Sequence, residues 1–185
     1  MDALPPGLQA RLIRLMEMVE SIGLDSMREP HVKHIDGKLW ELRAKAAEGI
    51  ARGLYIAVAG RRVVILHVFV KKNAADTTKC SGSSLSTDEA GGNMKTLGEL
   101  KKKYVKDPEF RKHYKQADRE YAVIELLIRT RTQAKLSQAE LAKRMATTQS
   151  AIARLEGGKV SPSIATLRRY AEATGYELRV DMTPL

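Results

Sequence analysis

The feature that most constrains the fold of this chain is the segment LSQAELAKRMATTQSAIARLEGG, residues 136–158. Ser137, followed three residues later by Glu140, matches the capping-box pattern and predicts the start of a short helix. Thr148 predicts the N-cap of a second helix, and the glycines at 157–158 predict its end. Ala146 stands in the turn between them, where glycine is usual, and it requires a compatible backbone conformation. We therefore predict a helix-turn-helix for this segment.

Polar residues at the start of the second predicted helix point to DNA, because their side chains suit hydrogen bonding to base edges in the major groove. Residues at the first turn of the preceding helix and just past the second helix are placed to reach phosphates. The net charge is +10, most of it in residues 94–185, which also suits a polyanionic partner. The alternative is the solvated polar face of an ordinary helical bundle. The predicted DNA-binding residues are Gln138, Thr148, Gln149, Ser150, Arg154 and Lys159.

The sequence around this motif predicts further helices and one strand. Residues 94–120 look helical and basic, with Asp107 as an N-cap and Pro108 in the first helical position. Ser163 predicts the start of a helix after the motif. The alternation in YELRVDM, from Tyr176, predicts a closing strand that pairs within the chain or across a dimer. The C-terminal half is thus expected to be an all-α helix-turn-helix bundle.

The N-terminal half predicts an α+β fold, a helix plus a small antiparallel sheet. Apolar residues at three- and four-residue spacing predict one amphipathic helix over residues 5–24. KLWELRA and GIARGLYIAVAGRRVVILHVFVKK then predict at least three strands, with a turn near residues 59–62. Residues 63–70 are almost continuously apolar, which favours the central, most buried strand.

Basic side chains on or next to these strands are candidates for chemistry on RNA. Arg43, Arg52 and Lys71 would hold a phosphate and stabilise the charge that develops when a 2′-hydroxyl attacks it, with His67 and Tyr55 as weaker candidates. The alternative is that such residues simply solvate the strand ends. No spacing indicates a metal site, and we expect no cofactor.

The order and spacing of these strands resemble the RelE/HigB-like toxins of bacterial type II toxin–antitoxin systems, over residues 3–72. The resemblance rests on the Glu-Leu-Arg strand, the strand with Arg52 and Tyr55, and the end of the last strand, His67-x-Phe69-x-Lys71-Lys72. It implies a metal-independent, ribosome-associated mRNA endonuclease. The family has an edge strand before the helix and a Thr-Gln-x-Thr-Pro segment with a final helix after the lysines, and neither is found here. We therefore expect an incomplete, inactive toxin-like half.

The C-terminal motif resembles the lambda-repressor-type (XRE/Cro-like) helix-turn-helix family over residues 121–175, and the whole segment from residue 94 resembles HigA-type antitoxins. This resemblance implies a homodimer that binds operator DNA and represses its own operon. It also implies that the extra helices of residues 94–120 contact the toxin.

The Ser- and Gly-rich segment of residues 73–93 has two interpretations. Its composition suits a flexible linker. Alternatively, if the codons of residues 72–93 are read one base late, they can encode a peptide with the Thr-Gln-x-Thr-Pro pattern followed by a helix. In the same shifted frame, the codons of Met94 and Lys95 necessarily give a TGA stop. In that case a frameshift has fused a toxin gene to an antitoxin gene.

The sequence thus predicts a toxin–antitoxin protein with four parts: a toxin-like segment at 1–72, a linker or frameshifted segment at 73–93, antitoxin helices at 94–120, and a DNA-binding domain at 121–185. A single cysteine, Cys80, and the lack of a long apolar run fit the cytoplasm. Two alternatives remain: an active or self-inhibited ribosome-dependent mRNA endonuclease, and a stand-alone helix-turn-helix repressor.

Overall fold

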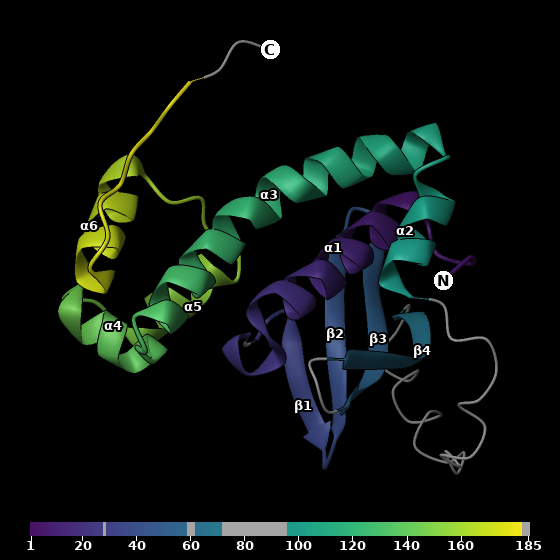
Figure 1. Cartoon of the computed structure of the whole chain (residues 1–185), viewed down its shortest axis with the longest axis horizontal. Helices are drawn as coiled ribbons and strands as arrows, with labels where there is room; N and C mark the ends of the chain where they lie inside the picture. Colours follow the sequence, from purple (N-terminus) through teal and green to yellow (C-terminus); the bar gives the residue numbers. More distant parts are fainter. Residues whose placement is uncertain (28, 59–61, 72–95, 183–185) are drawn as a thin grey trace.

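The computed structural model describes residues 1–27, 29–58, 62–71 and 96–182, so the predicted turn at 59–62 and the segment 73–93 lie almost wholly outside the described residues. None of the described helices is both long and apolar enough to cross a membrane. The elements follow one another along the chain (Figure 1) as α1 Pro6–Ile22, η1 Leu24–Ser26, β1 Val32–Asp36, β2 Leu39–Ala46, β3 Gly49–Val58, β4 Arg62–Lys71, α2 Leu97–Tyr104, α3 Pro108–Gln133, α4 Gln138–Arg144, α5 Gln149–Glu156 and α6 Ile164–Thr174.

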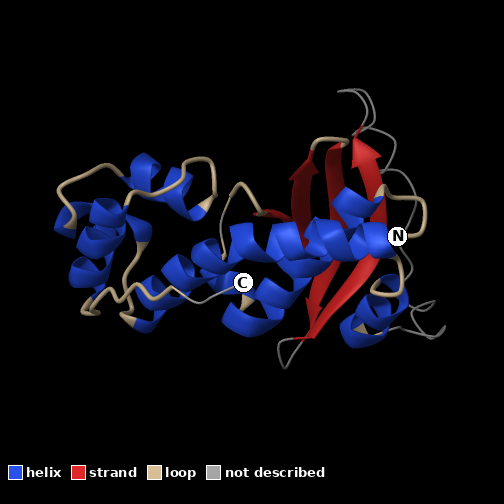
Figure 2. Cartoon of the chain, turned by 90° about the horizontal axis from the view of Figure 1, so that it is seen from above, coloured by secondary structure: helices blue, strands red, loops and turns tan. Residues whose placement is uncertain are grey.

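The N-terminal half is an antiparallel four-stranded meander covered by one helix. The strands lie in the order β1-β2-β3-β4, and Figure 2 shows α1 lying across one face of the sheet. The predicted helix is confirmed: Pro6 takes its first position, and Gly23 ends it at a φ of 82°. Its apolar face is fully buried against β2 and β3, where Leu42 and Tyr55 are also buried.

One expectation about the sheet needs correction, and one strand was not identified from the sequence. The prediction that residues 63–70 form the central strand was wrong, because β4 stands at the edge of the described sheet. Strands joined by successive hairpins lie side by side in chain order. The apolar content of a strand therefore does not decide which strands flank it. β1 was not expected at all, because its residues Lys33 to Asp36 are polar or exposed and carry no buried alternation.

The helices after residue 96 pack onto the N-terminal half. Figure 1 shows α3 running along α1, with α2 beside it. Tyr121, Ile124 and Ile128 of α3 share a buried cluster with the leucines of α1, and Phe110 shares another with Ile13. α3 runs unbroken through residues 120 and 121, where a boundary between antitoxin helices and DNA-binding domain was expected.

The C-terminal half is the predicted helical bundle. Ser137 and Glu140 form the expected capping box, and Asp107, Thr148 and Ser163 each accept a hydrogen bond at the start of the expected helix. α4, α5 and α6 enclose a core around Leu141, Ile152 and Tyr170 together with Leu127 of α3. Residues 176–182 form no strand within the described part of the chain. The Tyr176 hydroxyl donates to Gln133 Oε1 at 3.0 Å, and the chain then extends away from the bundle (Figure 1).

The turn of the helix-turn-helix holds a strained alanine. Ala146 has a φ of 49°, the left-handed region that glycine tolerates better than any residue with a Cβ atom. Its N–H donates to Lys143 O at 3.1 Å, and Thr147 N–H donates to Ala142 O at 2.9 Å, so the turn requires this conformation.

Replacing Ala146 with glycine is therefore expected to raise the free energy of unfolding by about 0.5–1 kcal/mol. The strain that glycine relieves in the folded chain is larger than the entropic cost of ordering glycine from the unfolded chain. Urea denaturation measures the change. The matched control is Ala122→Gly on the exposed face of α3, which should lower stability by about 1 kcal/mol. A loss of stability in both variants would contradict strain at the turn.

Candidate nucleic-acid interface

The outer face of α5 is exposed and polar, from Gln149 at its start to Arg154 in its last turn. Gln149, Ser150 and Arg154 are all exposed, as a helix that enters the major groove requires. Thr148 accepts the N–H of Ala151 at 3.2 Å and lies 3.1 Å from the Ser150 hydroxyl, so it fixes the helix end. The Arg154 Nε donates only to its own helix, to Ser150 O at 3.3 Å. Among the described residues no carboxylate lies within 4.0 Å of Arg154, which leaves the rest of its guanidinium available to a ligand.

The two predicted phosphate contacts differ in their surroundings. Lys159 is exposed just past α5, without a carboxylate partner in the described part of the chain. Gln138 is half-buried, and its Nε2 donates to Glu156 Oε2 at 2.9 Å. Its side chain thus has an internal role, and reaching a phosphate would require breaking that bond.

A buried ion pair behind α5 holds the recognition surface in place. Arg131 of α3 donates from Nε to Glu156 Oε1 at 2.6 Å and from Nη2 to Oε2 at 3.0 Å, and both side chains are less than a tenth exposed. The Tyr170 hydroxyl of α6 lies 2.7 Å from the same carboxylate. Burial and Glu156 raise the pKa of Tyr170, so the phenol stays protonated and can donate. This network joins α3, α4, α5 and α6.

Sequence reasoning missed this network, although one signal was available. Arg131 follows Ile124, Leu127 and Ile128 at helical spacing, so it lies on the apolar stripe of α3. A charged side chain on a buried stripe needs a partner of opposite charge.

The structure brings two of the three candidate RNA-cleavage residues together. Arg43 and Arg52 are directly opposite each other on β2 and β3, and both bind Glu41, which is only 3% exposed. Arg43 Nη2 lies 2.7 Å from Glu41 Oε2, and Arg52 Nη1 lies 2.6 Å from Oε1. Lys71 ends β4 opposite Ile50. Sequence reasoning did not anticipate that one carboxylate would bind both arginines.

The two weaker candidates lie in contrasting places. Tyr55 is fully buried, and burial raises the pKa of its phenol. An inaccessible neutral phenol cannot serve as a base. His67 is exposed on β4 and stacks on Phe69. Across the ranges that the structure describes, no three His, Cys, Asp or Glu side chains gather where one metal ion could bind them.

Comparison with known proteins finds a different family model for each half of the chain. Residues 1–86 match a family model described as Phage derived protein Gp49-like, and residues 127–180 match the Helix-turn-helix model. The proteins named Antitoxin HigA1 from two strains of Mycobacterium tuberculosis, CDC 1551 / Oshkosh and H37Rv, are each 35% identical to this chain over 74 residues. That stretch is 40% of this chain, and the chain spans about half the length of these curated relatives. The chain therefore carries a Gp49-like segment before a helix-turn-helix and is similar to curated antitoxins.

Proposed function

We propose that this chain is a toxin–antitoxin protein whose C-terminal half is a sequence-specific DNA-binding antitoxin and represses its own operon in the cytoplasm. The observation that carries the proposal is the outer face of α5, where Gln149, Ser150 and Arg154 are exposed on a helix anchored by a buried ion pair. The similarity to antitoxins and the net charge of +10 support it. The protein binds as a homodimer to half-sites about 34 Å apart, one turn of DNA.

The N-terminal half, in this proposal, is a RelE/HigB-like toxin fold that is inactive and held by the antitoxin helices of the same chain. Polar contacts between α1 and α3 support this arrangement. Arg14 is mostly buried and donates to Asp118 at 2.7 Å and to Glu125 at 2.6 Å. One turn further along α1, Glu17 accepts from Lys101 of α2 at 2.6 Å. The attachment of Arg43 and Arg52 to Glu41 supports inactivity, because that carboxylate competes with an RNA phosphate.

Replacing Arg154 with alanine tests the DNA-binding half. We expect it to weaken binding to the DNA upstream of the gene by about 1–3 kcal/mol and to relax base preference, as for loss of one bidentate base contact. The matched control is Arg111→Ala, an exposed arginine near the start of α3 and away from α5. Fluorescence anisotropy with the upstream duplex and a scrambled duplex measures both changes. Equal affinities for wild type and Arg154→Ala would contradict the assignment of α5 as the recognition helix.

The salt dependence of the same binding gives a second prediction. Phosphate contacts release counterions, so the logarithm of the affinity should fall linearly with the logarithm of salt concentration, by about 0.9 per phosphate neutralised. Lys159→Ala should reduce this slope by about one unit without changing base preference. A flat salt response would count against DNA as the partner.

A further inference from the structure

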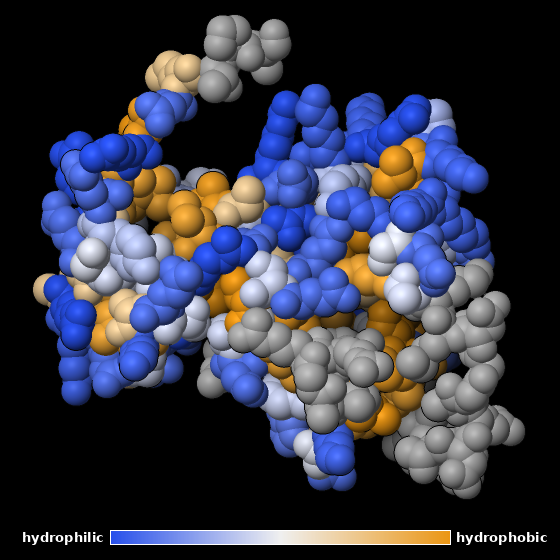
Figure 3. Space-filling view, viewed as in Figure 1, coloured by the Kyte–Doolittle hydropathy of each residue, from blue (hydrophilic) through white to orange (hydrophobic). Residues whose placement is uncertain are grey.

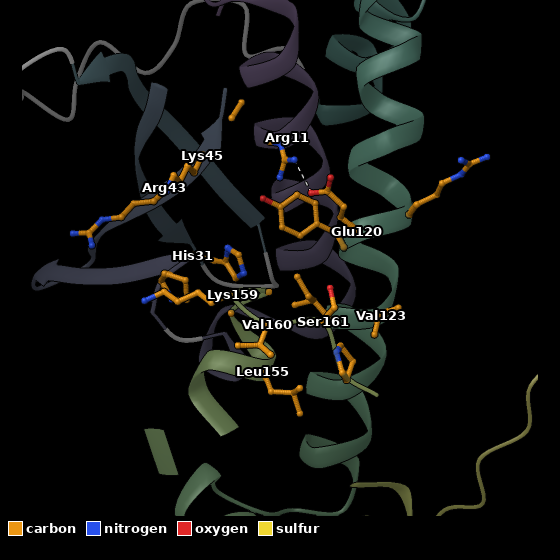
Figure 4. Close-up of a pocket in the computed structure, with 18 of the residues that line it drawn as sticks. Arg11, His31, Arg43, Lys45, Glu120, Val123, Leu155, Lys159, Val160 and Ser161 are labelled. Carbon is orange, nitrogen blue, oxygen red and sulfur yellow. Dashed lines mark ion pairs between the residues drawn. The ribbon is translucent and has the colours of Figure 1, made fainter. Parts of the chain in front are cut away.

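A cleft of about 1250 Å³ lies where the sheet, α1, α3 and the loop after α5 meet. Figure 4 shows its sides: His31, Arg43 and Lys45 come from the sheet region, Arg11 and Glu120 from α1 and α3, and Lys159 to Ser161 from the loop. Neither half of the chain forms this cleft alone. Of the predicted DNA-binding residues, only Lys159 lines it.

The halves approach closely at the edge of this cleft. A Cβ atom added at Gly157, at the end of α5, would lie 2.6 Å from Cδ of Pro30, which precedes the sheet. Both residues line the cleft, so its two sides are held together by direct contact. Figure 3 shows apolar surface in the region where the helical bundle meets the rest of the chain.

The lining of the cleft has an excess of positive charge. Its lining holds six arginine and lysine side chains, Arg11, Arg43, Lys45, Arg52, Arg119 and Lys159, but one carboxylate, Glu120. Glu120 pairs with Arg11 at 2.6 Å, and Glu41 behind the lining serves Arg43 and Arg52 together. Lys45, Arg119 and Lys159 have no carboxylate within 4.0 Å in the described ranges. The cleft is thus left with an excess of four positive charges, which favours a ligand with several negative charges.

Two buried polar atoms in the lining also lack partners. His31 is 8% exposed, and its Nε2 makes no hydrogen bond, nor does Nε of Arg52, within the described part of the chain. A buried polar atom without a partner costs about 1–3 kcal/mol, so native proteins rarely leave one unless a ligand or water completes it. Figure 4 places the His31 ring between the sheet and the loop that carries Lys159.

Much of the rest of the lining is apolar. It consists of Val123, Ile124, Leu155, Val160, Pro162 and Leu167, beside the ring of Tyr121, which meets His31 edge to face with centroids 5.5 Å apart. A purely inorganic anion would leave this surface without a contact. A ligand with a flat, weakly polar ring at one end and several phosphates at the other fits both parts of the lining.

We propose that the cleft binds a free nucleoside polyphosphate, with its phosphates at the cations of the sheet and Lys159 and its base against the apolar part of the lining. Arg43 and Arg52 remain attached to Glu41 and act as a fixed cationic surface, while Lys45, Arg119 and Lys159 supply unpaired charge. His31 Nε2 and Arg52 Nε complete their hydrogen bonding on the ligand. The inference goes beyond the proposed function, because it needs no DNA contact by α5.

Titration calorimetry of the full chain tests this proposal with ATP, GTP, adenosine and inorganic tripolyphosphate as probes. We expect a nucleoside triphosphate to bind more tightly than tripolyphosphate, and adenosine to bind weakly. The variant Lys45→Ala/Arg119→Ala should weaken triphosphate binding at least about tenfold, because it removes two charge-assisted contacts. Both side chains are exposed, so the fold is preserved.

Two controls separate this site from other surfaces. Lys33→Ala/Arg111→Ala removes the same two charges from exposed positions outside the lining and should leave nucleotide affinity unchanged. Arg154→Ala should lose DNA affinity but keep nucleotide affinity, so the two proposals fail independently. The proposal is overturned if no nucleotide binds, if tripolyphosphate binds as tightly as the nucleotides, or if the Lys45→Ala/Arg119→Ala variant binds like wild type. Binding of a single-stranded oligonucleotide without any binding of a free nucleotide would overturn it as well.

Discussion

Replacing Glu156 with leucine is expected to lower the free energy of unfolding by about 3–5 kcal/mol, because it leaves the guanidinium of Arg131 buried without its counter-charge. The two side chains are joined by two hydrogen bonds, of 2.6 and 3.0 Å, and are almost completely buried. Leucine also removes the acceptor of Gln138 Nε2, whereas the Tyr170 hydroxyl keeps Leu127 O as an acceptor at 2.8 Å. The unpartnered amide adds to the loss.

Urea denaturation followed by circular dichroism measures this change. The matched control is Glu172→Leu, an exposed glutamate of α6 with no ion pair among the described residues, which should change stability by about 0.5 kcal/mol or less. The double variant Arg131→Met/Glu156→Leu should recover much of the loss, because the buried charge is gone. A loss of less than about 1 kcal/mol in Glu156→Leu alone would show that Arg131 is hydrated rather than buried.

The same substitution has a consequence for DNA binding. Glu156 ends α5, so its contacts with α3, α4 and α6 fix the direction in which Gln149 and Arg154 project. In the absence of urea, where both variants are folded, Glu156→Leu should therefore bind the upstream duplex more weakly than Glu172→Leu does.

Local signals in the sequence predicted the helices well. The caps at Asp107, Ser137, Thr148 and Ser163 were all placed from the sequence, because a cap depends on side chains within three residues of the helix start. The helix-turn-helix followed from two such caps and one short turn. The exposed face of α5 followed in turn, since the apolar spacing leaves Gln149 and Arg154 on the outer face.

Contacts between distant residues could not be predicted in the same way. β4 was expected at the centre of the sheet because of its composition, yet strand order depends on which hairpins form. Glu41 was expected only as a residue of the Glu-Leu-Arg strand, whereas it binds an arginine from its own strand and another from β3. α3 continues through residue 121 because α1 packs along one side of it. The residues in contact, such as Arg14 and Asp118, are more than 100 positions apart in the sequence.

Lowering the pH from 7 to 5 is expected to reduce the free energy of unfolding by about 2 kcal/mol through His31 alone. Burial, with Arg11 nearby, lowers the pKa of His31 from 6.5 to about 4 in the folded chain. The groups that face its ring are Tyr121 of α3 and Arg11 of α1, and neither carries a negative charge in this pH range that would stabilise an imidazolium.

The direction follows from proton binding in the two states. Below pH 6.5 the unfolded chain binds a proton at His31 that the folded chain does not, so acid favours the unfolded chain. The effect is absent above about pH 7, grows as the pH falls through 6.5, and levels off below about pH 4, where the folded chain is protonated as well. Its full size is about 3 kcal/mol, at about 1.4 kcal/mol per pKa unit.

The variant His31→Phe isolates this contribution, because phenylalanine keeps an aromatic ring against Tyr121 but cannot bind a proton. Urea denaturation of wild type and His31→Phe at pH 7 and pH 5 gives the difference between their pH dependences, in which the titration of all other groups cancels. We expect the wild type to lose about 2 kcal/mol more than the variant between these pH values. Equal losses would mean that His31 takes up its proton in the folded chain as readily as in the unfolded one. The imidazole would then be in contact with water. Water would be the hydrogen-bond partner of Nε2 in the cleft lining, and the site would need no ligand to supply one.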